Sequence, residues 1–152
     1  MNREILFRGK RIDNREWVDG CYMTDEQDPT TAYIGHIFGI DDGMLIHDFD
    51  VVRVDPETVC RYTGLTDKNG RKIFEGDIVK GVAYSSDFVG AIVWIKEIAG
   101  FGVRYFNLHR EPTSWENSSI LKAIQAGRKD QFAAEVIGNI FDNPELLEGG
   151  AK

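Results

Sequence analysis

Cysteine, proline and histidine are scarce in this sequence of 152 residues, and long hydrophobic runs are absent. The two cysteines, Cys21 and Cys60, are too few for a disulfide scaffold, and no CxxC pair is present to bind zinc. The three histidines, His36, His47 and His109, lack the spacing of metal ligands. No apolar run approaches the roughly 18 residues that a membrane helix needs. We therefore expect no metal, no cofactor, no membrane association and two buried, reduced thiols.

Motifs that would announce a leader peptide or an enzyme are also missing. Residues 1–8 contain no apolar core long enough for a signal peptide, which together with the unpaired cysteines predicts a cytoplasmic protein. No GxSxG elbow, HExxH helix or phosphate-binding glycine loop is present. The sequence therefore favours a protein that is not an enzyme.

Positive charge is in deficit, and the deficit lies mostly in one half of the chain. Lysine and arginine number 18 against 25 acidic residues, which gives a net charge of −7. Residues 1–56 carry a net charge of −6, and residues 57–152 carry −1. Because Lys and Arg supply most of the affinity for phosphate backbones, this balance disfavours nucleic acid as a partner. Solubility is the simpler explanation of the acidic excess.

What the sequence does contain is glycine and many short apolar runs separated by turn residues, which predicts brief strands rather than long helices. We predict a mainly β fold of short antiparallel strands, with a strongly curved SH3-like barrel part after Pro56 and one or two short helices. Pro56 divides the chain into an N-terminal β module, 1–56, and a C-terminal module, 57–152, within one compact protein. The predicted strands are Glu4–Arg8, Glu16–Thr24, Ala32–Gly39, Met44–His47, Val51–Val54, Glu75–Val82, Val89–Lys96, Phe101–Phe106 and Ala134–Ile140.

Turn and helix signals punctuate the second half. The pair Asn69 and Gly70 favours a tight reversal, because both residues tolerate the positive φ of a type I′ hairpin turn. A capping box at Thr113–Glu116 predicts a helical insertion near 113–127. Asn143 followed by Pro144 predicts a C-terminal turn of helix.

Two groups of residues are candidates for chemistry. Trp94, with Lys80, Lys96 and Arg104 on neighbouring strands, could stack a base and contact phosphates, and these four are the candidate nucleic-acid-binding residues. Aromatic residues at strand spacing also belong to cores, and the pattern favours that reading of Trp94.

Glu75 and Asp77 form the second group. Residues two apart on a strand point the same way, so the two carboxylates could share acid–base work in a hydrolase. The simpler interpretation, which the pattern favours, is that Asp77 accepts backbone N–H groups where its strand begins.

Several segments, spread over almost the whole chain, together form a recognisable pattern: Phe7–Arg11, Glu16–Val18 with Gly20, Val54–Val59, Tyr62–Gly70, Ile73–Val79 and Glu135–Leu147. These segments resemble the YopX-like proteins of bacteriophages and prophages. The middle of the chain, roughly 111–132, matches this pattern less well.

The resemblance implies a small, mostly β-structured phage or prophage product in a bacterial host, and it brings no catalytic or ligand-binding residues with it. We expect a cytoplasmic, non-enzymatic protein-interaction module whose partner is an unknown host or phage protein. Short exposed strand edges make self-association a further hypothesis. The alternative is a nucleic-acid-binding accessory factor acting through the Lys80, Lys96 and Arg104 region, and a weaker alternative is a hydrolase using Glu75 and Asp77.

Overall fold

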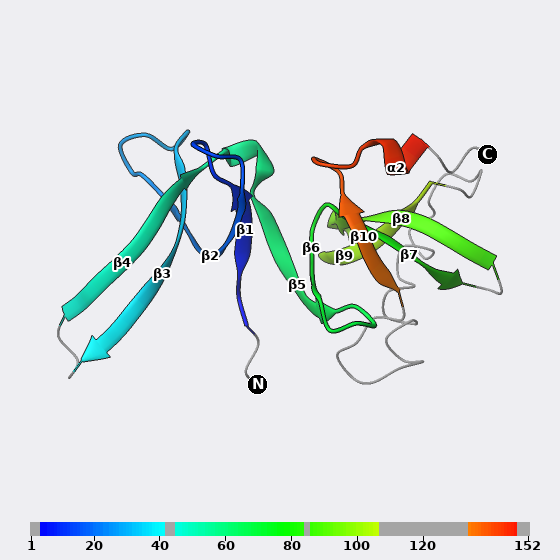
Figure 1. The fold of residues 1–152 in the computed structure, drawn as a ribbon, viewed down its shortest axis with the longest axis horizontal. Helices are drawn as coiled ribbons and strands as arrows, with labels where there is room; N and C mark the ends of the chain where they lie inside the picture. Colours follow the sequence, from blue (N-terminus) through cyan, green and yellow to red (C-terminus); the bar gives the residue numbers. More distant parts are fainter. Residues whose placement is uncertain (1–3, 42–44, 84–85, 107–133, 149–152) are drawn as a thin grey trace. The chain divides into compact units, whose positions relative to one another are not determined.

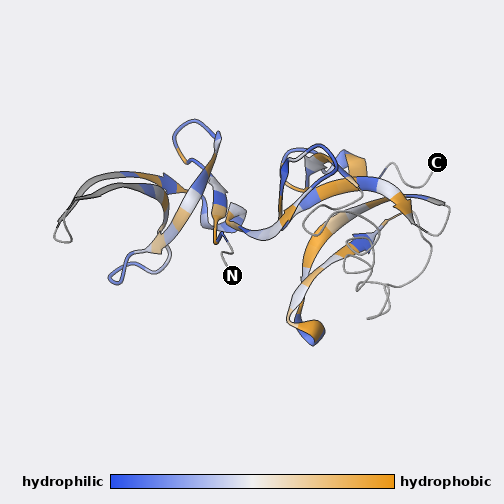
Figure 2. Ribbon diagram, turned by 90° about the horizontal axis from the view of Figure 1, so that it is seen from below, coloured by the Kyte–Doolittle hydropathy of each residue, from blue (hydrophilic) through white to orange (hydrophobic). Residues whose placement is uncertain are grey.

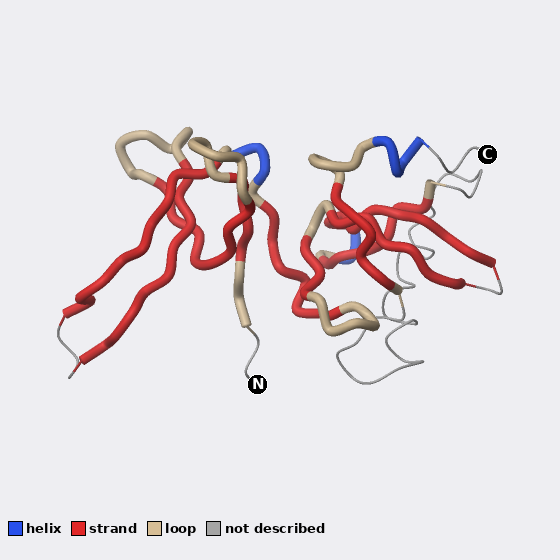
Figure 3. Tube along the Cα trace, in the orientation of Figure 1, coloured by secondary structure: helices blue, strands red, loops and turns tan. Residues whose placement is uncertain are grey.

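The chain divides into two compact units, Met1–Tyr62 and Thr63–Lys152 (Figure 1). Both consist almost entirely of antiparallel strands (Figure 3), so the predicted mainly β class is confirmed. The structure is a computed structural model that describes residues 4–41, 45–83, 86–106 and 134–148.

Four strands and the start of a fifth form the sheet of the first unit. They pair antiparallel in the order β4-β3-β2-β1-β5, and β5 continues into the second unit, where β6 follows it in the sheet. The sequence analysis divided the chain at Pro56. Cys60 and Arg61 of β5 pair with β1, however, so the first unit extends to Tyr62. The elements are β1 (Phe7–Lys10), β2 (Trp17–Thr24), β3 (Ala32–Asp41), β4 (Leu45–Val54), the 3-10 helix η1 (Pro56–Thr58) and β5 (Cys60–Thr66).

Strand β4 corrects one prediction. The segments 44–47 and 51–54 were expected as two strands with a bend at Asp48 and Asp50. These two residues instead pair with Phe38 and His36 of β3, so Leu45–Val54 is one strand. Long-range pairing with β3 therefore overrides the turn preference of the aspartates.

Alternation along the strands builds the core of the first unit. Ala32, Ile34 and Val54 are buried on one side of the sheet, because side chains two residues apart on a strand share a face. Gly9 lies close beneath them, and a Cβ at Gly9 would lie 3.1 Å from the Val54 side chain. Glycine is therefore the residue that lets β1 approach this core. Partly buried side chains that complete it are Phe7, Val18, Val52 and Val59.

The ends of β1 and β4 meet, so the four strands return on themselves. Arg11 forms an isolated bridge with Val54, the Ile12 N–H donates to the Arg53 carbonyl at 3.2 Å, and the Asp55 N–H donates to the Lys10 carbonyl at 2.8 Å. The sheet of the first unit is therefore curved, which the sequence analysis did not predict for the part before Pro56.

The second unit contains a four-stranded antiparallel sheet in the order β10-β7-β8-β9. Its strands carry long hydrophobic stretches (Figure 2), and a core of Ile73, Val79, Ile92, Val103 and other buried side chains covers one face. The elements are β6 (Lys72–Phe74), β7 (Asp77–Ala83), β8 (Ser86–Ile95), the 3-10 helix η2 (Lys96–Ile98), β9 (Gly100–Tyr105), β10 (Glu135–Asn139) and the helix α2 (Glu145–Glu148).

Helix α2 confirms the predicted C-terminal helical turn. The predicted helical insertion near 113–127 lies outside the described residues. Among the strands that the structure describes, no pairing joins β9 to β10, and no closed barrel is found. The SH3-like barrel therefore stays a prediction.

A buried carboxylate ties the second unit together. Asp67, which is 1% exposed, accepts the backbone N–H of Asn69 at 2.8 Å and of Arg71 at 2.9 Å through Oδ1. Its Oδ2 accepts the Val136 N–H of β10 at 3.0 Å. One side chain thus holds the turn after β5 and joins it to a strand 69 positions away.

The turn itself differs from the predicted type. The Gly70 N–H donates to the Asp67 carbonyl at 3.0 Å, so Lys68 and Asn69 are the central residues of this turn, and Gly70, which follows them, has a positive φ of 82°. Because Asn69 does not adopt a positive φ, the type I′ assignment is wrong, although the reversal itself is confirmed. The Asp67 carboxylate stabilises the observed turn by accepting the N–H of Asn69.

We expect Asp67→Asn to lower the free energy of unfolding of the second unit by about 1–3 kcal/mol, because an amide NH2 would face one of three N–H donors. Urea unfolding measures the loss, and hydrogen exchange at the Val136 amide localises it. The control is Asp19→Asn on the exposed side of β2, which should change stability by no more than about 0.5 kcal/mol. Equal effects of the two variants would contradict the role given to Asp67.

Candidate interaction surface

The side of β2, β3 and β4 that faces away from the first core carries apolar and aromatic side chains. Antiparallel register places Met23, Tyr33 and Arg53 in one row across the three strands, and Cys21, Gly35 and Val51 in the next. The same side of β2 continues through Asp19 to Trp17. We call this surface the outer face, and its side chains are Trp17, Asp19, Cys21, Met23, Tyr33, Val51 and Arg53.

Much of the outer face is open to solvent. Val51 is 38% exposed, Cys21 and Arg53 are exposed, and Met23 and Tyr33 are half-buried. Aromatic residues, methionine and arginine are the types enriched at protein interfaces. Their grouping on one exposed sheet face makes this surface the candidate site.

Two cations cover the ring of Trp17. The Arg8 Cζ atom lies 4.7 Å from the ring centroid, and the Lys10 Nζ atom lies 5.5 Å from it. Register explains the stack, because Lys10 pairs directly with Trp17 and Arg8 pairs with Asp19 on the same side of the sheet. Cation–π attraction of this kind is worth about 0.5–2 kcal/mol and holds the Trp17 indole in place.

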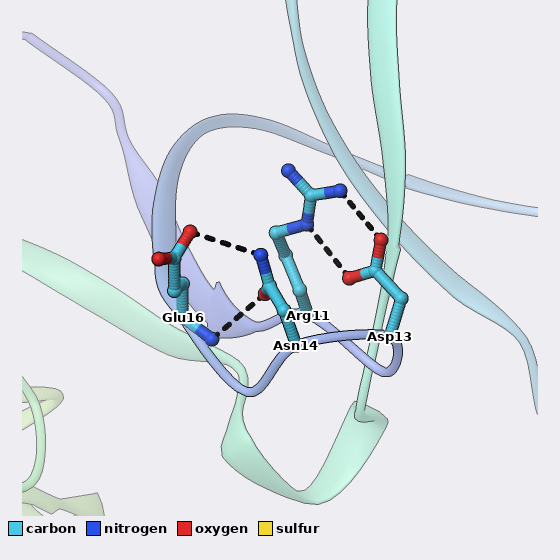
Figure 4. Close-up of polar contacts among 4 residues, drawn as sticks. All are labelled: Arg11, Asp13, Asn14 and Glu16. Atoms are coloured by element: carbon cyan, nitrogen blue, oxygen red, sulfur yellow. Dashed lines mark hydrogen bonds and ion pairs between the residues drawn. The ribbon is translucent and has the colours of Figure 1, made fainter.

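The polar side chains of the loop between β1 and β2 bond to one another (Figure 4). Arg11 donates two hydrogen bonds to the Asp13 carboxylate, at 2.8 and 2.6 Å, and this pairing lowers the pKa of Asp13. Asn14 donates to the Glu16 carboxylate at 2.9 Å and accepts the Glu16 N–H at 3.0 Å. These contacts order the loop.

The β2–β3 loop brings a carboxylate close to Arg53. Asp28 accepts the Thr30 N–H at 3.1 Å, the Thr30 hydroxyl, and the Thr31 hydroxyl at 2.7 Å. These hydrogen bonds, the one from the Thr30 side chain above all, lower the pKa of Asp28, and the charge of Arg53 contributes further. Arg53 itself donates to the Thr31 hydroxyl at 3.4 Å.

The four candidate nucleic-acid residues do not share one surface. Lys80 pairs with Val89 and Arg104 with Ala91, so these two exposed cations lie on the same face of the second sheet. Trp94 lies on the opposite face, where it meets Phe101 edge-on at 5.3 Å and is 39% exposed. Lys96 begins η2 after the end of β8 and is exposed.

The two candidate hydrolase carboxylates have different environments. Asp77 is fully buried, and its Oδ2 accepts the Phe74 N–H at 2.8 Å, as the simpler interpretation predicted. Glu75 is half-buried in the turn before β7, beside Gly76, whose φ is 80°. The hydrogen bond gives Asp77 a structural role in that turn.

The two thiols differ in burial. Cys60 is buried, with its Sγ 3.2 Å from the Thr58 carbonyl oxygen, whereas Cys21 is exposed. The expectation of two buried thiols is therefore wrong for Cys21, because strand alternation places it on the outer face. Within the described residues, no group of three or more His, Cys, Asp or Glu side chains could hold a metal ion. Nor is any of their helices long and apolar enough to cross a membrane.

Sequence reasoning missed the outer face. In Trp17–Thr24 apolar residues occur at both odd and even positions, so no polar–apolar alternation marks which side faces the core. The pairing of β2 with β3, and of β3 with β4, decides which side of β2 faces the core. The register of these pairings cannot be derived from the sequence of β2 alone.

The family model described as YopX protein matches residues 6–148, and the chain belongs to this family. The crystal structure of protein EF1440 from Enterococcus faecalis is similar, with 22% sequence identity, a TM-score of 0.50 and coverage of 96% of this chain and 99% of that one. This likeness concerns the fold. No curated protein matches the chain.

We expect Thr30→Ala to raise the pKa of Asp28 toward its ordinary value of 3.8, because the variant removes the largest cause of its depression. A carboxylate with a depressed pKa favours folding above pH 3.8, and this contribution is lost as the pH falls through the folded pKa. Carbon-detected NMR titration measures the shift. The pKa of Asp13, held low by Arg11, is the internal control, and an unmoved Asp28 would contradict the assignment.

Proposed function

We propose that this YopX-family chain is a phage- or prophage-encoded, non-enzymatic interaction protein that acts in the cytoplasm of its bacterial host. The observation that carries the proposal is the exposed outer face of the first unit, which holds Met23, Tyr33 and Val51 beside Arg53. In this proposal the second unit, with an SH3-like curvature, is a scaffold built around Asp67.

Composition and burial support a protein partner over a substrate. Apolar side chains at an exposed sheet face gain free energy when a partner covers them, at roughly 25 cal/mol per Å². The partner is a host or phage protein, and self-association through strand edges is the related hypothesis. The hydrolase hypothesis ranks lowest, because Asp77 is fully buried and bonded to the Phe74 backbone.

The proposal predicts that affinity capture of the full-length protein from nuclease-treated, prophage-induced cells retains a specific protein. Val51→Asp on the outer face should remove that protein, because a carboxylate would be buried against apolar groups. The matched control is Val82→Asp, which changes a valine that is 66% exposed on β7 of the second unit and should leave capture intact. Capture of proteins from untreated cells but of none from nuclease-treated cells would contradict the proposal.

The second candidate function, a nucleic-acid-binding accessory factor, has one supporting observation. Lys80 and Arg104 are exposed on the same face of the second sheet. Two cations on a chain with a net charge of −7 give little counterion release.

We therefore expect fluorescence anisotropy with a 20-nucleotide single strand and a 20-base-pair duplex to show no binding below about 10 µM protein at roughly 150 mM salt. Arg104→Glu and Lys96→Glu should leave both curves unchanged. Tighter binding that falls steeply with salt and is lost in Arg104→Glu would reverse the order of the two functions.

A further inference from the structure

Asn69 differs from the other asparagines of the chain in the residue that follows it. The sequence contains seven asparagines, and Asn69 is the one that a glycine follows. Asparagine is a thermolabile residue, because the backbone nitrogen of the next residue can attack its side-chain carbonyl carbon. Gly70 has no Cβ to hinder that approach. The sequence therefore marks Asn69 as the most reactive of the seven.

The structure leaves the Asn69 side chain and Gly70 open. Both residues are exposed, and a Cβ added to Gly70 would meet no heavy atom within 4 Å. Among the described asparagines, Asn69 is also the one whose side chain forms no hydrogen bond. The side-chain amides of Asn14, Asn139 and Asn143 each donate to a carboxylate. The Asn69 side chain can thus turn toward the Gly70 nitrogen without breaking a contact of its own.

The residues that follow the other described asparagines disfavour the same attack. Arg15 follows Asn14 and β-branched Ile140 follows Asn139, so a side chain crowds each attacking nitrogen. Pro144 follows Asn143 and has no N–H to lose. These three asparagines are therefore internal controls for Asn69.

The Asp67 turn restrains the attacking nitrogen. The Gly70 N–H donates to the Asp67 carbonyl at 3.0 Å, and the Asp67 carboxylate accepts the flanking N–H groups of Asn69 and Arg71. The Gly70 nitrogen must lose its proton before it can attack, so this turn must first open. Residues 68–71 are all exposed, and a local opening of such a segment uncovers little apolar surface.

We propose that Asn69 is a site of spontaneous deamidation and that the product releases β10 from the Asp67 turn. The Gly70 nitrogen, after losing its proton to hydroxide, forms a bond to the Asn69 side-chain carbonyl carbon. The side-chain amide takes a proton from water and leaves as ammonia, and a succinimide ring remains. Water then breaks one of the two ring C–N bonds, which gives aspartate or isoaspartate. This inference is independent of the proposed function.

Isoaspartate changes the turn because the main chain then runs through the former side chain. An extra carbon atom lies between residues 69 and 70, so the N–H groups of Gly70 and Arg71 shift relative to Asp67. A second carboxylate also appears beside the Asp67 carboxylate and repels it. The turn lies beside the start of β10, where Asp67 accepts the Val136 N–H at 3.0 Å (Figure 1). We therefore expect that hydrogen bond to weaken.

The test is incubation of the native full-length protein in mildly alkaline buffer, beside a sample unfolded in urea that sets the time scale. Peptide mass spectrometry, with methylation by a protein isoaspartate methyltransferase, should locate isoaspartate at residue 69 and none at Asn14, Asn139 or Asn143. Hydrogen exchange at the Val136 amide should be at least about tenfold faster in the converted protein. Asn69→Asp, which has the added charge but a normal main chain, should exchange within about threefold of the wild type.

Two further variants test the restraint by Asp67. Asp67→Asn should form isoaspartate at residue 69 at least about fivefold faster, because the turn opens more often. Asp19→Asn should form it at the wild-type rate, and Asn69→Gln should form none over the same period.

Three outcomes would overturn the inference. The first is native protein without isoaspartate at residue 69 when the urea-unfolded sample has converted completely. The second is equal rates of formation in Asp67→Asn and the wild type. The third is an unchanged exchange rate at Val136 in the converted protein.

Discussion

The second unit depends on the buried carboxylate of Asp67. Three backbone N–H groups converge on it, two from its own turn and one from Val136 of β10. The Lys68 N–H adds a further link by donating to the Ala134 carbonyl at 3.0 Å, and the Lys68 ammonium pairs with the Glu135 carboxylate. Desolvating a carboxylate is unfavourable unless hydrogen bonds replace the lost water, and here the backbone supplies them. The same bonds define where β10 can lie.

The first unit is organised differently, by close backbone approach and register. Gly9 lets β1 come within contact of the Val54 side chain, and the Arg11–Val54 bridge brings β1 and β4 together. One side of the sheet thereby holds the core of the unit, and on the other side Cys21, Val51 and Arg53 are exposed. The Arg8 and Lys10 stack on Trp17 follows from that register, since cross-strand neighbours share a face.

Sequence reasoning recovered much of the fold and little of the candidate site. The turn at Asn69 and Gly70, the strand ending near Asn139 and the helical turn after Asn143 follow from local chemistry, and each is present. The bend at Asp48 and Asp50 was wrong, because pairing with β3 outweighs the preference of aspartate for turns. Lys80, Arg104 and Trp94 looked like one group, since spacing along separate strands does not reveal which face each strand shows.

By itself, the sequence determined the mainly β class, the positions of most strands and turns, the acidic first half and the likeness to the YopX family. These properties depend on neighbours along the chain, on composition or on motif order. Only the tertiary structure decided which side of each strand is buried, that Cys21 is exposed, and that Arg53 stands in a row with Tyr33 and Met23. The physical reason is that a shift of one residue in pairing moves every side chain of a strand to the opposite face, and pairing is set by contacts distant in sequence.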